Sequence, residues 1–270
     1  MEIREKILTN LKAVKERNPL IHHITNYVTV NDCANIVLAL GGSPVMADDH
    51  EEVAEMVGFA SALVLNIGTL NSRTIESMLI AGKRAKDIGV PIILDPVGVG
   101  ATQLRTKTAQ KLIQELNPNV IRGNMSEISV LAGQEVAIKG VDSLADEQDS
   151  TVIAKKLASA LNCVIAITGK TDVVSDGKQL CLLDNGHRIL ADVTGTGCMT
   201  TSLVGTYCGA TTDYFSAAVA GIASMGLAGE IAQASLHHGE GIGTFRARMF
   251  DSIYNLTPEQ LAQESKIRHE

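Results

Sequence analysis

The chain has 270 residues, which is enough for one large α/β domain, and we expect residues 1–270 to form a single domain. Its net charge is -7, from 23 basic and 30 acidic residues, and no run of Lys and Arg could follow a phosphate backbone, so we expect no nucleic-acid partner. The 5 cysteines include no CxxC pair, which argues against a disulfide framework or a thiolate zinc site and favours reduced thiols in the cytoplasm.

The N-terminal 20 residues predict an amphipathic helix, because Ile3, Ile7, Leu11 and Val14 recur at helical spacing among charged residues. No export signal is evident there. The most apolar run, residues 217–229, is shorter than the roughly 18 residues that span a bilayer. We therefore expect a buried helix at that run and no membrane association.

Short apolar runs alternate with helical patterns along the middle of the chain, which is typical of βαβ units. Strands are predicted within 62–69, 91–100, 119–124 and 163–170, and helices over 71–89, 149–162 and 257–270. Apolar residues are continuous in the strands, so both faces should be covered. Asp176-Gly177 predicts a hairpin. The fold class is thus α/β, with a mostly parallel central sheet and helices on both faces.

Polar residues follow the predicted strands, at the edge where an open α/β sheet binds ligands. They are Asn66-Ile-Gly68-Thr69, Asp95-Pro96-Val97-Gly98, Arg122-Gly123-Asn124 with Glu127, Thr168-Gly169-Lys170 and Gly195-Thr196-Gly197-Cys198. This set suits phosphoryl transfer, which needs positioning and charge neutralisation more than covalent chemistry.

Asp95 and Glu127 could hold Mg²⁺ directly or through water, and Arg122 and Thr168 could contact nucleotide phosphates. The turn from Gly195 to Cys198 would present backbone amides at a helix N-terminus to the transferred group.

Each residue also has a purely structural interpretation. The Asp-Pro pair at 95 could begin a turn, and Glu127 could stabilise the first turn of its own helix. Arg122 could form an ordinary ion pair, and Thr168 a strand-end hydrogen bond. The two glycines before Cys198 could form a tight turn only.

Standard motif tests narrow the choice. Thr168-Gly-Lys-Thr resembles the end of a Walker A loop, but Val164 stands where that loop needs a glycine. No GxGxxG fingerprint is present, and Val204 stands where a cysteine phosphatase would carry its phosphate-binding arginine. The histidine pairs at 22–23 and 237–238 lack metal-binding spacing.

With these residues assembled, the chain resembles the hydroxyethylthiazole kinases of thiamine salvage, a branch of the ribokinase-like superfamily, over almost its whole length. The resemblance lies in "HHITNYVTVNDCAN" (22–35), "GGSPVMADD" (41–49), "LVLNIGTL" (63–70), "LDPVGVGAT" (94–102), "IRGNMSEI" (121–128), "AITGKTDVVSDG" (166–177) and "VTGTGCMTTSL" (193–203). It implies a three-layer ribokinase-like fold and phosphorylation of 4-methyl-5-(2-hydroxyethyl)thiazole by ATP.

The resemblance also implies roles for individual residues. Asp95 and Glu127 would be linked to Mg²⁺, Arg122 and Thr168 would contact ATP, and the substrate would meet Met46, the Gly195 backbone and Asn26. It further implies a homotrimer with active sites between subunits.

Cys198 takes the position where most ribokinase-like kinases carry an aspartate base. We expect it to align the substrate hydroxyl and help accept its proton. A helix N-terminus should lower the pKa of its thiol below the usual value of roughly 8.5, although a nearby phosphate would oppose that shift.

Three alternatives remain open. The chain could phosphorylate another small alcohol, such as a hydroxymethylpyrimidine or pyridoxal. It could be a nucleotide-binding sensor that lost turnover when cysteine replaced the aspartate. A redox protein built on Cys198 is a third possibility, but Cys208, ten residues on, is too far along the same predicted helix to resolve it.

Overall fold

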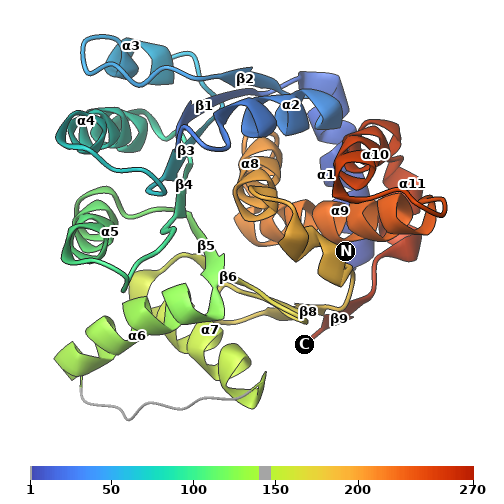
Figure 1. The fold of residues 1–270 in the computed structure, drawn as a ribbon. Coiled ribbons are helices and arrows are strands. Elements are labelled where there is room, and N and C mark those ends of the chain that lie inside the picture. Colours follow the sequence, from blue (N-terminus) through green and yellow to red (C-terminus); the bar gives the residue numbers. More distant parts are fainter. Residues whose placement is uncertain (1, 140–146) are drawn as a thin grey trace.

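The computed structural model describes residues 2–139 and 147–270, and within them a nine-stranded sheet lies between two layers of helices (Figure 1). The strands are β1 (Leu20–Ile24), β2 (Ser43–Val45), β3 (Ala62–Asn66), β4 (Ile92–Asp95), β5 (Val120–Asn124), β6 (Val164–Thr168), β7 (Asp172–Ser175), β8 (Leu180–Leu183) and β9 (Ile267–His269).

The α-helices are α1 (Ile3–Arg17), α2 (Val30–Leu40), α3 (Val53–Val57), α4 (Ser72–Ile88), α5 (Gln103–Leu116), α6 (Met125–Lys139), α7 (Glu147–Leu161), α8 (Thr196–Cys208), α9 (Tyr214–Ala234), α10 (Ile242–Asn255) and α11 (Pro258–Glu264). A short 3-10 helix, η1, spans Arg188–Asp192. The predicted α/β class and the three-layer order are confirmed.

The sheet has the order β2-β1-β3-β4-β5-β6-β7-β8-β9. Every neighbouring pair from β2 to β6 is parallel, and every pair from β6 to β9 is antiparallel. The four strands predicted from continuous apolar runs are confirmed as β3 to β6. The predicted hairpin joins β7 to β8, with Gly177 at φ +91°, a conformation that favours glycine.

Successive residues of a strand enter opposite layers, as β3 shows. Leu63 and Leu65 pack with the helices α3 to α7, whereas Ala62 and Val64 pack with α1, α2 and α8 to α11. All five β3 residues are buried. This two-sided burial explains why the strand sequence shows no polar alternation.

Helix α8 packs unusually closely on the sheet and on α9. A Cβ atom on Gly205 would lie 2.5 Å from Val64 Cγ2, and one on Gly221 of α9 would lie 2.7 Å from the Val204 backbone nitrogen. Helix α9 is long and apolar enough to cross a bilayer by composition, but 89% of its most apolar window is buried within the fold. The buried helix predicted at 217–229 is therefore confirmed.

The C-terminal tail is only partly as predicted. The helical pattern expected over 257–270 ends with α11 at Glu264, and Ile267–His269 forms β9 against β8. The tail thus supplies the hydrogen bonds of a sheet edge, a tertiary contact that its polar sequence does not reveal.

Candidate active site

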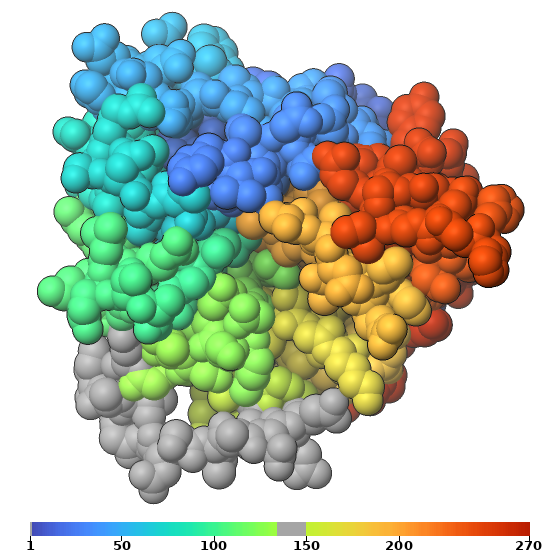
Figure 2. All heavy atoms as spheres, in the orientation of Figure 1, coloured from blue at the N-terminus to red at the C-terminus, as the bar shows by residue number. Residues whose placement is uncertain are grey.

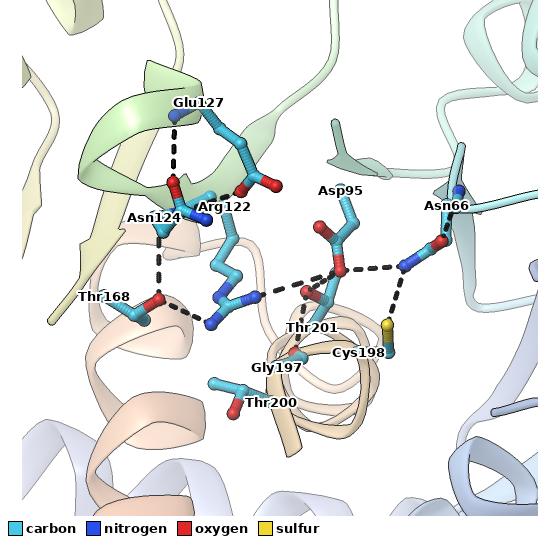
Figure 3. Close-up of polar contacts among 12 residues, drawn as sticks. Asn66, Asp95, Arg122, Asn124, Glu127, Thr168, Gly197, Cys198, Thr200 and Thr201 are labelled. Atoms are coloured by element: carbon cyan, nitrogen blue, oxygen red, sulfur yellow. Dashed lines mark hydrogen bonds and ion pairs between the residues drawn. The ribbon is translucent and has the colours of Figure 1, made fainter. Parts of the chain in front are cut away.

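Polar side chains from four strands meet at the carboxyl edge of the parallel sheet (Figure 3). Asn66 ends β3 and pairs in register with Asp95, which ends β4. Asn124 of β5 pairs with Thr168 of β6, and Arg122 lies two residues before Asn124. Parallel strands bring their carboxyl ends to one edge, so the sequence-predicted residues Asp95, Arg122 and Thr168 come together there.

Asp95 is fully buried at the centre of this cluster. Its Oδ2 atom accepts hydrogen bonds from the Thr201 hydroxyl at 2.7 Å and from Asn66 Nδ2 at 2.9 Å, and lies 3.9 Å from Arg122 Nη1. Burial raises the pKa of Asp95 to about 6, against the lowering effects of Arg122 and of the Thr201 hydrogen bond. The Oδ1 atom has no hydrogen-bond partner, so it is available to a ligand.

Arg122 and Thr168 form one wall of a cavity of about 520 Å³. Arg122 donates a hydrogen bond to the Thr168 hydroxyl, and its own Nε atom is buried without a partner. The rest of the lining comes from three residues after β6, six residues of the segment 185–191, the start of α8 and three residues of α9: Gly169, Lys170, Asp172, Asn185, Gly186, His187, Arg188, Leu190, Ala191, Thr196, Gly197, Thr200, Ile222, Met225 and Gly226. A small polar ligand fits a cavity of this size, and a buried guanidinium favours an anionic one.

The N-terminus of α8 faces this cavity. Gly195 precedes the helix at φ +90°, and a Cβ there would lie 2.6 Å from Thr29 Cγ2. A Cβ on Gly197 would lie 2.9 Å from Arg122 Nη1. Both glycines are therefore needed for close approach, and the free amides of the first turn stand beside the arginine, where a phosphate would be stabilised.

Glu127 stabilises the first turn of its own helix, the structural role that the sequence left open. Asn124 and Glu127 cap α6 reciprocally: each backbone N–H donates to the other's side chain at 2.9 Å. The second carboxylate oxygen of Glu127 accepts the Gly98 N–H at 2.8 Å. Both oxygens are thus occupied by backbone amides, and Glu127 joins the loop after β4 to the start of α6.

The donor set fits Mg²⁺ better than a metal held entirely by protein. Among the residues that the structure describes, no three His, Cys, Asp or Glu side chains form a metal-binding group. Asp95 offers one unpartnered buried oxygen, and Glu127 already accepts two amides, so a water-mediated contact suits it. Mg²⁺ keeps several waters and completes its shell with substrate phosphates.

Cys198 lies in the first turn of α8, and its sulfur accepts hydrogen bonds from Asn66 Nδ2 at 3.3 Å and Asn26 Nδ2 at 3.4 Å. The predicted lowering of its pKa is wrong. Burial raises the pKa of the thiol, and the nearby charge of Asp95 raises it further. The thiol is therefore protonated near neutral pH, which the helix position alone could not show.

The two other expected substrate residues differ in how closely they join this cluster. Asn26 is buried, and its amide contacts both Asn66 and Cys198. Met46 follows the edge strand β2 and is partly exposed. Strand β2 pairs with β1, and His22 of β1 donates a 2.7 Å hydrogen bond to the carbonyl of the next residue, Ala47.

Sequence reasoning assigned no role to three residues that the structure places here. Asn66 contacts both Asp95 and Cys198, and Thr201 donates to Asp95. Asp172 lines the cavity, where burial raises its pKa to about 6. The spacing of Thr201, three residues after Cys198 on one helix, could have indicated a shared face.

Segments distant in sequence build this part of the molecule. Atoms of the N-terminal region (blue), the middle of the chain (green) and α8 with its neighbours (orange) meet at the centre of the face in Figure 2. A buried arginine and a helix N-terminus beside one cavity, at the carboxyl edge of a mostly parallel sheet, are the arrangement expected of a ribokinase-like small-molecule kinase.

Comparison with known proteins gives the particular family. The sequence model described as the hydroxyethylthiazole kinase family matches residues 11–259. The hydroxyethylthiazole kinase of Alkaliphilus oremlandii is 50% identical over 268 residues, covering 99% of both chains. That of Thermoanaerobacter pseudethanolicus is 51% identical over 260 residues, covering 96% of this chain and 98% of the relative. The chain belongs to the hydroxyethylthiazole kinase family.

Solved structures agree with this assignment. The hydroxyethylthiazole kinase protein of Pyrococcus horikoshii OT3 superposes with a TM-score of 0.90 at 37% identity, covering 98% of this chain and 99% of that one. The Staphylococcus aureus pyridoxal kinase in complex with AMP-PCP has a TM-score of 0.63 at 14% identity, over 93% and 98% of the two chains. The second similarity shows the shared ribokinase-like fold.

Proposed function

We propose that this chain transfers the γ-phosphoryl group of ATP to the hydroxyl of 4-methyl-5-(2-hydroxyethyl)thiazole, within a single domain. Family membership supports the reaction. The observation that carries the proposal from the structure is the position of Asp95, buried between the arginine-lined cavity and Cys198. The Asp95 carboxylate thereby lies between the cavity and the cluster of Asn26, Asn66 and Cys198.

ATP occupies the cavity in this proposal. Arg122 and Thr168 contact its phosphates, and the amides at the start of α8 receive the transferred group. The unpartnered Nε of Arg122 supports this placement, because a buried guanidinium nitrogen without an acceptor is costly unless a ligand satisfies it.

Asp95 and Glu127 would hold Mg²⁺, Asp95 through its unpartnered Oδ1 atom and Glu127 through water. The ion neutralises phosphate charge when bound. Arg122 lies 3.9 Å from Oδ2, the other oxygen of Asp95, so a fixed cation orients the carboxylate even before a metal arrives.

The alcohol would bind against Asn26, Met46 and the Gly195 backbone, with Cys198 aligning its hydroxyl. The hydroxyl oxygen attacks the γ-phosphorus, the bond from that phosphorus to the leaving ADP oxygen breaks, and the hydroxyl proton passes late to an oxygen of the transferred phosphoryl group. Phosphoryl transfer through a loose transition state needs little help from a base. A protonated thiol held by two amide donors is therefore suited to positioning.

The proposal includes a cytoplasmic homotrimer whose sites lie between subunits. Tyr27 and Val28, directly after the substrate residue Asn26, are 78% and 59% exposed, so large apolar side chains beside the site lack cover within the subunit. All five cysteines are free, which suits a reducing compartment.

ADP release from Mg-ATP tests the reaction, with the thiazole alcohol, a hydroxymethylpyrimidine, pyridoxal or no alcohol added. We expect release that depends on the thiazole and falls sharply in Glu127→Gln. Turnover with only another alcohol would refute the substrate. ATP binding without any turnover would favour a nucleotide sensor instead.

A further inference from the structure

Both polar atoms of the Asn66 side chain form two hydrogen bonds each, and no step of the reaction above uses this residue. It is 2% exposed at the end of β3. Its Oδ1 atom accepts the Gly68 N–H at 2.9 Å and Asn26 Nδ2 at 3.0 Å. Its Nδ2 atom donates to Asp95 Oδ2 at 2.9 Å and to Cys198 Sγ at 3.3 Å. A primary amide has two donor hydrogens and two acceptor lone pairs, so its capacity is filled.

The partners also fix which way the amide points. The Gly68 backbone nitrogen can only donate, and an ionised Asp95 carboxylate can only accept. A flipped Asn66 would set a donor against a donor and an acceptor against an acceptor. The NH₂ group therefore faces Asp95 and Cys198, as Figure 3 shows, with Asn66 between the carboxylate and the sulfur.

The position of Asn66 determines which atoms of Asp95 and Cys198 are free to contact a ligand. Asn66 and Thr201 together occupy Oδ2 of Asp95, which leaves Oδ1 as the free oxygen. Asn66 and Asn26 together make the sulfur of Cys198 an acceptor of two N–H bonds. One amide thus joins the nucleotide side of the site to the alcohol side.

We infer that Asn66 is a positioning residue for phosphoryl transfer, whose side-chain NH₂ group holds the Asp95 carboxylate and the Cys198 sulfur in one fixed geometry. The inference rests on the proposed roles of those two residues. It differs from a purely structural role, in which the amide would only complete the hydrogen bonding of a strand end.

Asn66→Asp is the most informative variant, because it retains an acceptor for Gly68 and Asn26 while replacing the NH₂ group with oxygen. Asn71→Asp is the matched control. Asn71 ends the loop that follows β3, and its side chain caps α4 by accepting the Thr74 N–H, which an aspartate also does. Both variants add one negative charge within five residues of each other.

Two measurements at pH 8.5 test the inference: steady-state kinetics, and the rate at which iodoacetamide alkylates Cys198, followed by peptide mass spectrometry. For Asn66→Asp we expect kcat to fall about 10- to 100-fold, the usual effect of losing a partner that orients site ligands, with KM for ATP within about threefold. Alkylation should slow about tenfold, because a donor to the thiolate is lost. Asn71→Asp should match the wild type in both.

The inference is overturned if folded Asn66→Asp keeps a kcat within about twofold of the control, or if its alkylation rate is unchanged or faster. Should Asn66→Asp not fold, Asn66→Ala is judged by the same two measurements. Cys198→Ala separates this inference from the proposed function. Full activity in Cys198→Ala would refute the role of the thiol, while the alkylation result would still report the contact between Asn66 and Cys198.

Discussion

Replacing Asp95 with Asn should make the protein more stable and much less active. The unfolded carboxyl has a pKa of 3.8, and burial raises the folded value to about 6. Ionising Asp95 at neutral pH therefore costs the folded state roughly two pKa units, or about 3 kcal/mol. Asparagine has the same shape and does not ionise. Its Oδ1 can still accept hydrogen bonds from Asn66 and Thr201, which now meet the carboxylate.

The sign of the pH dependence follows from this raised pKa. In the wild type, ionisation of Asp95 lowers the free energy of unfolding as pH rises from about 4 to about 6, and the loss persists at higher pH. Asp95→Asn has no carboxyl to ionise there and so avoids this loss. The stability advantage of the variant should therefore be near zero at pH 4 and about 3 kcal/mol at pH 8, or about 6 °C in Tm for a chain of this length.

Urea unfolding of both proteins at pH 4.5, 6 and 8, without nucleotide or metal, measures this difference. Glu115→Gln is a useful control, because Glu115 is a partly exposed carboxylate paired with Lys83 at the surface. An Asp95→Asn protein that is no more stable than wild type at pH 8, or whose advantage does not change with pH, would refute the assignment of a costly buried charge.

Three further predictions use other parts of the site and core. Cys198→Ala should lower kcat about tenfold, which is less than the hundredfold or more that a general base contributes. Cys198→Asp should retain activity. An aspartate variant that folds and binds substrate but is inactive would contradict the alignment role. Gly195→Ala should cost about 1–3 kcal/mol in unfolding free energy and reduce turnover, because Gly195 has φ +90° and Thr29 leaves no room for a Cβ atom. Unchanged turnover would contradict a close approach of substrate to this turn. Tyr207→Phe should cost about 0.5–1.5 kcal/mol, because it removes the buried 2.8 Å hydrogen bond between Tyr207 and Ser224, while the Ser224 hydroxyl keeps its bond to the Ala220 carbonyl. The value of kcat per folded molecule should stay the same, and a kinetic effect would show that this contact reaches the site.

The parallel half of the fold could be predicted from sequence because its signals are local. Strand Ile92–Asp95 is an apolar run that ends in a turn, and helix Ser72–Ile88 ends at Gly89, which adopts the left-handed conformation at φ +75°. The edge strand Ile267–His269 could not be predicted. Its pairing depends on β8, more than 80 residues earlier, rather than on its own polar sequence.

Part of the candidate site's membership could be predicted, but its electrostatics could not. The sequence predicts Asp95, Arg122 and Thr168 together because each lies at or near the carboxyl end of a parallel strand. The pKa of Cys198 was predicted in the wrong direction, because the position at a helix start is visible in sequence, whereas its burial and the nearby charge of Asp95 are not. Asn66 was visible after its strand, yet only the three-dimensional contacts show that it joins two other residues.

The most direct test of the central claim is transfer of the labelled γ-phosphoryl group of ATP to the thiazole alcohol in a single turnover, by wild type and by Asp95→Asn. The account predicts labelled thiazole phosphate from the wild type, and from the variant nucleotide binding with transfer slowed at least a hundredfold. Transfer by Asp95→Asn at the wild-type rate would contradict an active site centred on Asp95.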